Sequence, residues 1–260
     1  MFRNLLSLFF MALVFTGCKQ DKEEEEKPVK NSAPLSFQKE SLVRKAGEHC
    51  DTADYDCSII ALDVVRAKGA SEVSEKINRR LDEHTIGLVA TQENPDIANL
   101  EELAEKFLKD YREAAENFSE EPPWEAYVDQ KVYMQSDSLI SIGITTEIFS
   151  GGAHGYKTLT FLNIDPATGK KLSKNDIFEE DFSPFVEQRF RQEQGIPEDE
   201  NINSTGFWFE NETFSLPENI GFSEEKVILI YNSYEIAPYA AGDIVMEIPL
   251  QEVRPFMKIE

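Results

Sequence analysis

The apolar residues of this 260-residue chain change their spacing at Pro122-Pro123, and this change limits the folds open to it. Before the prolines, apolar residues recur every three or four positions, as on one helix face. They are Val73, Ile77 and Leu81, then Leu100, Leu103, Phe107, Tyr111 and Ala114. After the prolines, apolar and polar residues alternate over 124–134 and 140–148, which is typical of half-buried strands. Because helices and strands are grouped rather than alternating, the sequence predicts an α+β fold.

Turn and capping residues mark where the remaining elements begin and end. We expect a first strand over Ser58–Val65, then two helices within 71–117 that are separated by Asn94-Pro95-Asp96. Later elements are a strand over Lys157–Ile164, a helix through Phe190 that ends at Gly195, strands over Gly206–Leu216, Val227–Tyr231 and Asp243–Ile248, and a short helix over Leu250–Met257. They divide into an N-terminal part, 35–164, with an antiparallel sheet and two long helices, and a smaller α+β part, 165–260.

Residues 1–17 have the organisation of a bacterial lipoprotein signal peptide. Arg3 supplies a positive charge, and an apolar run from Leu5 to Phe15 follows. The run has about half of the roughly 20 residues that cross a membrane. It ends in Phe15-Thr16-Gly17-Cys18, which resembles a lipobox. We therefore expect cleavage before Cys18 and lipid on this cysteine. The alternative is an ordinary signal peptide in which the cysteine is incidental.

Residues 18–34 contain almost no side chain that could be buried, so we expect an acidic, disordered tether. Its run Glu23–Glu26 resembles the signal by which some Gram-negative bacteria send lipoproteins to the outer face of the outer membrane. A plain solvated linker is the alternative. The sequence thus predicts a lipid-anchored protein of the cell envelope at the outer membrane, and leaves open whether it faces the surface or the periplasm.

Two further cysteines, Cys50 and Cys57, lie close together in the chain. An even pair in an exported protein usually forms a disulfide. A metal site would need more ligands than these two thiols and the adjacent His49. We therefore predict a Cys50–Cys57 disulfide.

Acidic residues outnumber basic ones by 49 to 26, which gives a formal net charge of −23. Loss of Arg3 with the signal would make it −24. Nucleic acid is excluded as a partner, because its binding needs basic patches that replace counterions. The charge would attract a basic protein over long range. The alternative is that it serves solubility alone.

The segment Ser150–Gly155 is the first candidate binding loop. Gly151 and Gly152 would let backbone approach a ligand or adopt positive φ. His154 could act as an acid, a base or a ligand. The alternative is a loop between two strands in which the glycines serve bends and the histidine bonds locally.

The segment Tyr231–Gly242 is the second candidate. Tyr234, Glu235 and Tyr239 stand near Pro238 and several small residues. Aromatic clusters of this kind suit sugar rings or the centre of a protein interface. The alternative is a rigid corner between two core strands.

Signatures of common enzyme classes are missing from the chain. There is no Gly-x-Ser-x-Gly, no His-Glu-x-x-His and no phosphate-binding loop. The three histidines, His49, His84 and His154, are far apart, and His84 is expected at a surface or edge of the first helix. We predict no catalytic residues, no metal site and no cofactor. The alternative is an enzyme that acts on envelope polysaccharide, a hydrolase or deacetylase that uses His154 and nearby carboxylates.

Three motifs together resemble the RsiV/PdaC-like family: Ser150–Gly155, Leu172–Phe178 and Tyr234–Gly242. That family supplies the extracellular domain of a lysozyme-sensing anti-sigma factor, an accessory domain of a peptidoglycan deacetylase, and lipoproteins of unknown function. The resemblance implies an α+β fold of two joined parts. This chain has a lipoprotein signal where the anti-sigma factor has a membrane-spanning helix, and no separate deacetylase domain is recognisable in it.

The resemblance therefore implies a binding module of the cell envelope rather than an enzyme. Its candidate ligands are lysozyme-like proteins, which are basic where this chain is acidic, and peptidoglycan glycans. A structural lipoprotein with a protein partner is a further alternative.

Overall fold

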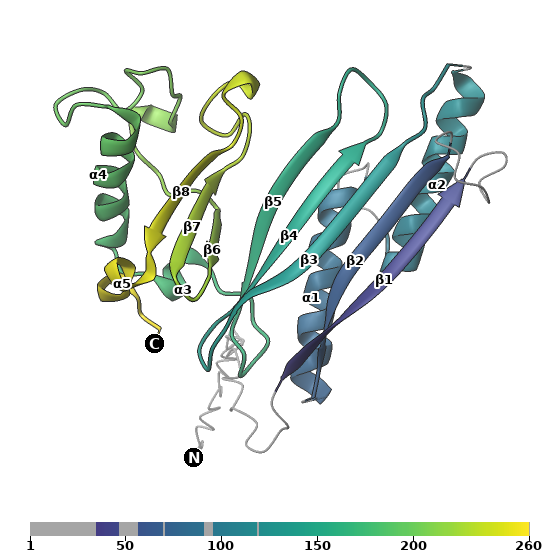
Figure 1. Ribbon diagram of the computed structural model, residues 1–260, viewed down its shortest axis with the longest axis horizontal. Coiled ribbons are helices and arrows are strands. Elements are labelled where there is room, and N and C mark those ends of the chain that lie inside the picture. The colour runs from purple at the N-terminus through teal and green to yellow at the C-terminus, as the bar shows by residue number, and fades with distance from the viewer. Residues whose placement is uncertain (1–34, 47–56, 70, 91–95, 119, 260) are drawn as a thin grey trace, which may run out of the picture.

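The computed structural model of this chain describes residues 35–46, 57–69, 71–90, 96–118 and 120–259. Two units lie side by side in it (Figure 1): a five-stranded sheet with two long helices, and a three-stranded sheet with shorter helices. The α+β class is thus confirmed. The signal peptide, the tether, Cys18 and Cys50 lie outside the described residues, so lipidation and the disulfide stay predictions. Within the described part, no helix is long and apolar enough to cross a membrane.

The five-stranded sheet has the order β1-β2-β3-β4-β5. Its strands are β1 (Ser36–Ala46), β2 (Ser58–Lys68), β3 (Glu125–Gln135), β4 (Ile140–Phe149) and β5 (Tyr156–Ile164). All neighbours are antiparallel except β2 and β3, which run parallel. The exception follows from the connection between them, because a chain that crosses over through helices returns in the same direction.

Strand β1 is an element that the sequence does not predict. Nearly all of its side chains are exposed, because it is an edge strand that pairs only with β2. Its large apolar residues, Phe37, Leu42 and Val43, follow no alternation. Phe37 and Leu42 are only partly buried against the core, so backbone pairing with β2 is the main contribution that holds the strand in the sheet. The exposed charged side chains of Lys39, Arg44 and Lys45 disfavour pairing of this edge with a strand of another chain.

Helices α1 (Ser71–Val89) and α2 (Leu100–Asn117) cover one face of this sheet (Figure 1). Asn99 caps α2: its side chain accepts from the Glu102 N–H at 3.0 Å, and the Glu102 carboxylate accepts from the Ala98 N–H at 2.8 Å. The predicted apolar stripes are buried against alternate residues of the sheet, among them Ile142, Ile144 and Leu162. The spacing of apolar residues therefore predicted this layer correctly.

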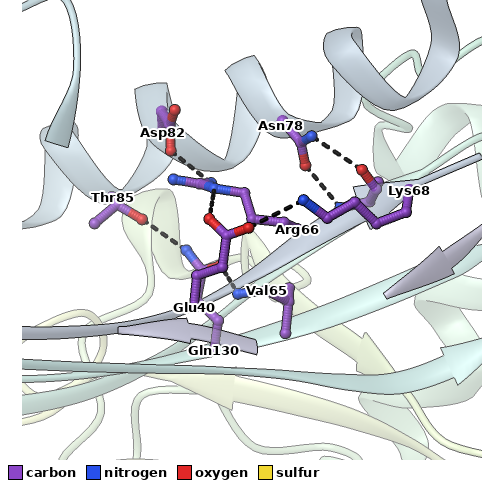
Figure 2. A network of polar contacts seen from close by, with 9 residues as sticks. Glu40, Val65, Arg66, Lys68, Asn78, Asp82, Thr85 and Gln130 are labelled. Carbon is purple, nitrogen blue, oxygen red and sulfur yellow. Dashed lines mark hydrogen bonds and ion pairs between the residues drawn. The ribbon is translucent and has the colours of Figure 1, made fainter. Parts of the chain in front are cut away.

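A polar network ties α1 to the sheet beneath it (Figure 2). The buried Gln130 accepts from the Val65 N–H at 3.0 Å and donates to the Thr85 hydroxyl at 2.8 Å. The Asn78 side-chain amide accepts a hydrogen bond from the Ala67 N–H and donates one to the Ala67 carbonyl. Arg66 pairs with Asp82 at 2.7 Å. The backbone pairing of β2 with β3 ends at Asp129, one residue before Gln130. Where the strands separate, the Gln130 side chain therefore replaces a backbone group as the hydrogen-bond partner of β2.

The second unit packs helices on a small antiparallel sheet of order β6-β7-β8. Its elements are α3 (Lys174–Ile177), α4 (Phe182–Gln194), β6 (Asn219–Phe222), β7 (Lys226–Tyr231), β8 (Ile244–Pro249) and α5 (Leu250–Val253), with 3₁₀ turns at Glu210–Glu212, Tyr239–Ala241 and Arg254–Phe256. Gly195 ends α4 with φ 66°. A core of aromatic side chains surrounds Phe190.

The prediction of a strand over Gly206–Leu216 is wrong. This segment is irregular and contains only the 3₁₀ turn Glu210–Glu212, and the strand at this place is β6, further along the chain. Asn211 and Glu212 have φ of 51° and 56°, which interrupts extended backbone. The alternating Phe207, Phe209 and their neighbours mimic a strand because they anchor the segment to Phe190.

The two units meet where β6 and β7 lie against β5. Phe161 of β5 packs with Ile228 and Ile230 on the face that α1 and α2 do not cover. A Cβ at Gly221 of β6 would overlap the Phe161 ring, so only glycine permits this approach. The Asn219 amide accepts from the Phe161 N–H at 2.8 Å and donates to the Leu159 carbonyl, and thereby covers part of the free edge of β5.

Candidate functional site

The two candidate loops meet at one end of the molecule. The first joins β4 to β5 and the second joins β7 to β8, and Figure 1 shows both at the same end of the two sheets. The His154 ring stacks on Tyr239, with centroids 4.8 Å apart and planes inclined by 21°. Tyr239 stacks on Tyr234, at 5.5 Å and 29°. We call these three residues the aromatic ladder.

The rings of the aromatic ladder are open to solvent. Tyr234 is 63% exposed and Tyr239 42%, and His154 is exposed as well. Exposed aromatic rings gain little by stacking on each other alone, whereas a partner that covers them would bury large apolar area. The alternative of a corner packed into the core therefore does not describe Tyr234 and Tyr239, although Tyr231 at the start of the loop is buried.

Carboxylates hold the second loop in its shape. Glu235 accepts from the Asn232 N–H at 2.9 Å, and Asp243 accepts from the Ser233 N–H and hydroxyl at 2.8 and 2.9 Å. Burial raises the pKa of Glu235, and the charge of Glu218 adds to the effect. The Glu235 carboxylate therefore stabilises the conformation of the loop, and we expect any contact that it makes with a ligand to be secondary to this role.

Backbone strain accompanies the exposed ring of Tyr234. Its φ is 71°, a region that costs a non-glycine residue about 1–2 kcal/mol. Gly242, at φ 69° and ψ −161°, has a conformation that is open almost only to glycine. The loop thus turns Tyr234 outward at a cost in free energy, which is typical of residues that contact a ligand.

Gly151 and Gly152 have a conformational role in the first loop. Their φ values are 87° and 86°, which glycine adopts without strain. A Cβ at Gly151 would also press on the Glu121 carboxylate, which accepts from the Trp124 indole at 2.6 Å. The two glycines set the course of the loop that presents His154.

Trp208 is a surface residue of this region that sequence reasoning missed. It is 45% exposed, and its indole donates to the Glu235 carbonyl at 3.2 Å while its backbone N–H donates to Ile236 at 3.0 Å. The only signal in the sequence was its position between Phe207, which is partly buried, and Phe209, which is buried.

A groove of about 340 Å³ continues from Tyr239 toward the sheet. It is lined by Tyr127 and Tyr156 together with Glu125 and Glu147. The pKa of the Tyr127 phenol is raised by burial and by repulsion from these two carboxylates. Lys157, the cation of the groove, pairs with Glu147. The surroundings of the aromatic ladder are therefore acidic.

The arrangement of side chains in this region suits recognition. His154 makes a local hydrogen bond, between its Nδ1 and the Gly155 carbonyl at 3.2 Å. In the described ranges, no group of three or more histidine, cysteine and acidic side chains could hold a metal ion. Stacked rings with carboxylates around them suit contact with the surface of a partner.

Comparison with known proteins places the chain among two families. Residues 51–157 match the family described as deacetylase PdaC, and residues 172–251 match the protein family of unknown function DUF3298. The resemblance to the RsiV/PdaC-like family is thus confirmed, as two consecutive matches, PdaC and then DUF3298. No curated protein matches it. The description of PdaC names a deacetylase, but the matched region is an accessory domain, so it assigns no catalysis to this chain.

Solved structures of DUF3298 proteins share the fold of this chain. A DUF3298 family protein from Pseudomonas aeruginosa PAO1 has a TM-score of 0.62 and 22% sequence identity, over 87% of this chain and 95% of its own. A member from Bacteroides fragilis NCTC 9343 has a TM-score of 0.63 and 20% identity, over 86% and 93%. The two-unit architecture is therefore that of DUF3298 proteins.

The aromatic ladder joins the two family regions. His154 lies within the PdaC match, and Tyr234 and Tyr239 lie within the DUF3298 match. Neither region holds the stack alone.

His84 differs from its predicted place at the surface. Its Nε2 shares a hydrogen bond with the Thr160 hydroxyl at 3.0 Å, across from α1 to β5. Burial, helped by the charge of Lys171, lowers the pKa of His84 to about 4. The prediction failed because the second unit adds residues 171–178 beside α1, which spacing along the helix cannot reveal.

We expect the stability of this PdaC/DUF3298 chain to fall as pH decreases from about 6.5 to 4. The unfolded chain protonates His84 near its ordinary pKa of 6.5, whereas the folded chain does so near 4, so the unfolded state binds more protons between them. Linkage gives a loss of about 3 kcal/mol at pH 4. Denaturant unfolding at several pH values measures it.

Two variants isolate the contribution of His84 from that of the carboxylates. His84→Gln should flatten the pH dependence by about that amount, because it removes the titrating group. His154→Gln, which changes an exposed histidine outside this contact, is the matched control. Equal pH profiles for His84→Gln and the parent would contradict the prediction.

Proposed function

We propose that this chain is a non-catalytic binding module of the cell envelope, held at the outer membrane by lipid on Cys18. Its binding surface is the aromatic ladder with Trp208 beside it. The observation that carries the proposal is the stack of three exposed rings on two loops, one of them with a strained tyrosine. Such rings are typical of the centre of an interface, where a few aromatic residues contribute most of the binding energy.

The ligand we favour is a basic protein of the lysozyme type. The loop that carries Tyr234 and Tyr239 contains Glu235 and Asp243 and no lysine or arginine, and the whole chain has a net charge of −23. This charge would speed encounter with a cationic protein, and the rings would supply the short-range contact. Peptidoglycan glycan is the second candidate, because flat exposed rings also stack on sugars.

We expect Tyr239→Ala to weaken binding of a basic lysozyme at least 10-fold, since Tyr239 is the middle ring and its loss removes both stacking contacts. The mature chain from residue 18, with Cys18→Ser to remove the thiol that would carry lipid, is titrated by calorimetry at about 10 and 150 mM salt. Phe118→Ala is the matched control, because Phe118 is an exposed aromatic residue at the end of α2.

The outcomes separate the candidate ligands. Binding that survives 150 mM salt and is lost in Tyr239→Ala supports lysozyme recognition. Binding at low salt alone, equal in Tyr239→Ala and the parent, would mean that net charge accounts for it. In a parallel assay with isolated sacculi, retention that depends on Tyr239 supports the glycan. Absence of both, or turnover of glycan that depends on His154, overturns the proposal.

A further inference from the structure

The groove beside Tyr239 offers a partner a second set of contacts, next to those of the aromatic ladder. Its volume of about 340 Å³ is near the lower end of the range for small-molecule sites, so it suits a single side chain. Tyr127 of β3 and Tyr156 of β5 line it together with Tyr239. We call it the tyrosine groove.

The three tyrosines of the groove have rings that a ligand can reach. Tyr127 is 40% exposed, Tyr156 48% and Tyr239 42%. The Tyr156 hydroxyl donates to the Leu88 carbonyl at 3.4 Å, and the Tyr239 ring stacks within the aromatic ladder, so contacts within the chain fix both rings. Aromatic faces attract cations as well as apolar groups, because the π-electrons make the face of a ring negative.

Two carboxylates stand on the same face of the sheet as Tyr127. Glu147 lies directly opposite Tyr127 in the pairing of β3 with β4, and Glu125 lies two residues before it. Ala126, between them, belongs to the core under α1 and α2, so these side chains are on the face that the helices leave open. Burial is the largest cause of the raised pKa of the Tyr127 phenol, and the charges of both carboxylates add to it.

Glu125 is the carboxylate of the groove that lacks a cation. Lys157 lies opposite Glu147 in the pairing of β4 with β5 and forms an ion pair with it. The Glu125 carboxylate has no ion pair and no hydrogen bond in the described ranges, which leaves the groove with one uncompensated negative charge. An organic cation would use both the rings and this charge, whereas a neutral sugar would use the rings alone.

We propose that the tyrosine groove binds the guanidinium group of an arginine side chain of the partner, with the cation on the tyrosine rings and the Glu125 carboxylate as the acceptor of its hydrogen bonds. Guanidinium suits this site better than ammonium, because it is planar, stacks on aromatic faces and donates two parallel hydrogen bonds to one carboxylate. The assignment of the cation to a bound protein rests on the proposed function, whereas the affinity of the groove for the cation can be measured by itself.

The test is titration of the mature chain from residue 18, with Cys18→Ser, with n-butylguanidinium at about 10 mM salt, followed by two-dimensional ¹⁵N–¹H NMR. We expect saturable shifts of the signals of Glu125, Tyr127 and Tyr156. n-Butylurea, which has a similar shape and no charge, should bind at least about 5-fold more weakly, because it loses the attraction to both the carboxylate and the rings. Equal binding of n-butylurea would overturn the proposal.

Variants assign the contacts. Glu125→Gln should weaken n-butylguanidinium binding about 5-fold, because a charge-assisted hydrogen bond becomes a neutral one. Tyr127→Val, which keeps a residue favourable in strands, should also weaken it about 5-fold, whereas Tyr127→Phe, which keeps the ring, should weaken it less than about 2-fold. Glu105→Gln is the matched control, because it removes the same charge from an exposed glutamate of α2 outside the groove.

The outcomes distinguish this inference from the proposed function. If n-butylguanidinium causes no saturable shifts, or if Glu105→Gln weakens its binding as much as Glu125→Gln does, the groove proposal is overturned, and binding of lysozyme through Tyr239 would still support the proposed function. Saturable binding of n-butylguanidinium that Glu125→Gln and Tyr127→Val weaken supports the groove, even where lysozyme does not bind. If lysozyme binds, Glu125→Gln should weaken its binding about 5-fold as well.

Discussion

Replacement of Phe190 by alanine should lower the free energy of unfolding by about 4 kcal/mol. Its ring is fully buried, and Phe209 and Tyr231 meet it edge to face with centroids 5.3 and 5.8 Å away. Phe207 and Phe214 also surround it. The loss combines the transfer free energy of the ring with the cost of the cavity that remains. Chemical denaturation followed by tryptophan fluorescence measures it.

Phe185→Ala is the control for this prediction. Phe185 lies on the same helix, but it is only partly buried and stacks on Phe256 near the surface, so we expect less than half of the loss. The irregular segment that carries Trp208 is anchored on Phe190, so Phe190→Ala should also weaken binding at the aromatic ladder. Similar losses of stability for both variants would show that Phe190 is not the centre of this core.

Gln130→Leu should lower the free energy of unfolding by about 3 kcal/mol. The side chain is 1% exposed and bonds the Val65 N–H and the Thr85 hydroxyl (Figure 2). Leucine has a similar volume but leaves both groups buried and unpaired, and each such group costs about 1–3 kcal/mol. Thermal and denaturant unfolding of the soluble chain give the loss.

A double variant tests the cause of this loss. Thr85→Val added to Gln130→Leu removes the unpaired hydroxyl, so about 1 kcal/mol should return, although Thr85→Val alone destabilises. Gln135→Leu, which changes an exposed residue of the same strand, should alter stability by less than about 0.5 kcal/mol. Strict additivity of Gln130→Leu and Thr85→Val would contradict the assigned network.

The spacing of apolar residues within single segments predicted the helices and strands that bury one face. The stripe Val73, Ile77 and Leu81 and the alternation through Ile140, Ile142 and Ile144 each occur within one segment, so no knowledge of the fold was needed. Strand β1 was missed because it buries almost nothing. The segment 206–216 was assigned as a strand because aromatic residues that anchor a loop alternate as strand residues do.

The candidate site likewise combines features that the sequence predicted with features that it did not. The sequence by itself identified both loops, since glycines and clustered aromatic residues are local signals. It did not determine that His154 and Tyr239 stack, that Trp208 lies beside them, or that His84 is covered. The place of Trp208 depends on contacts between distant segments of the second unit, and the His154–Tyr239 stack and the cover over His84 depend on how the second unit packs against the first. That packing rests on long-range contacts such as Gly221 on Phe161, which no local pattern encodes.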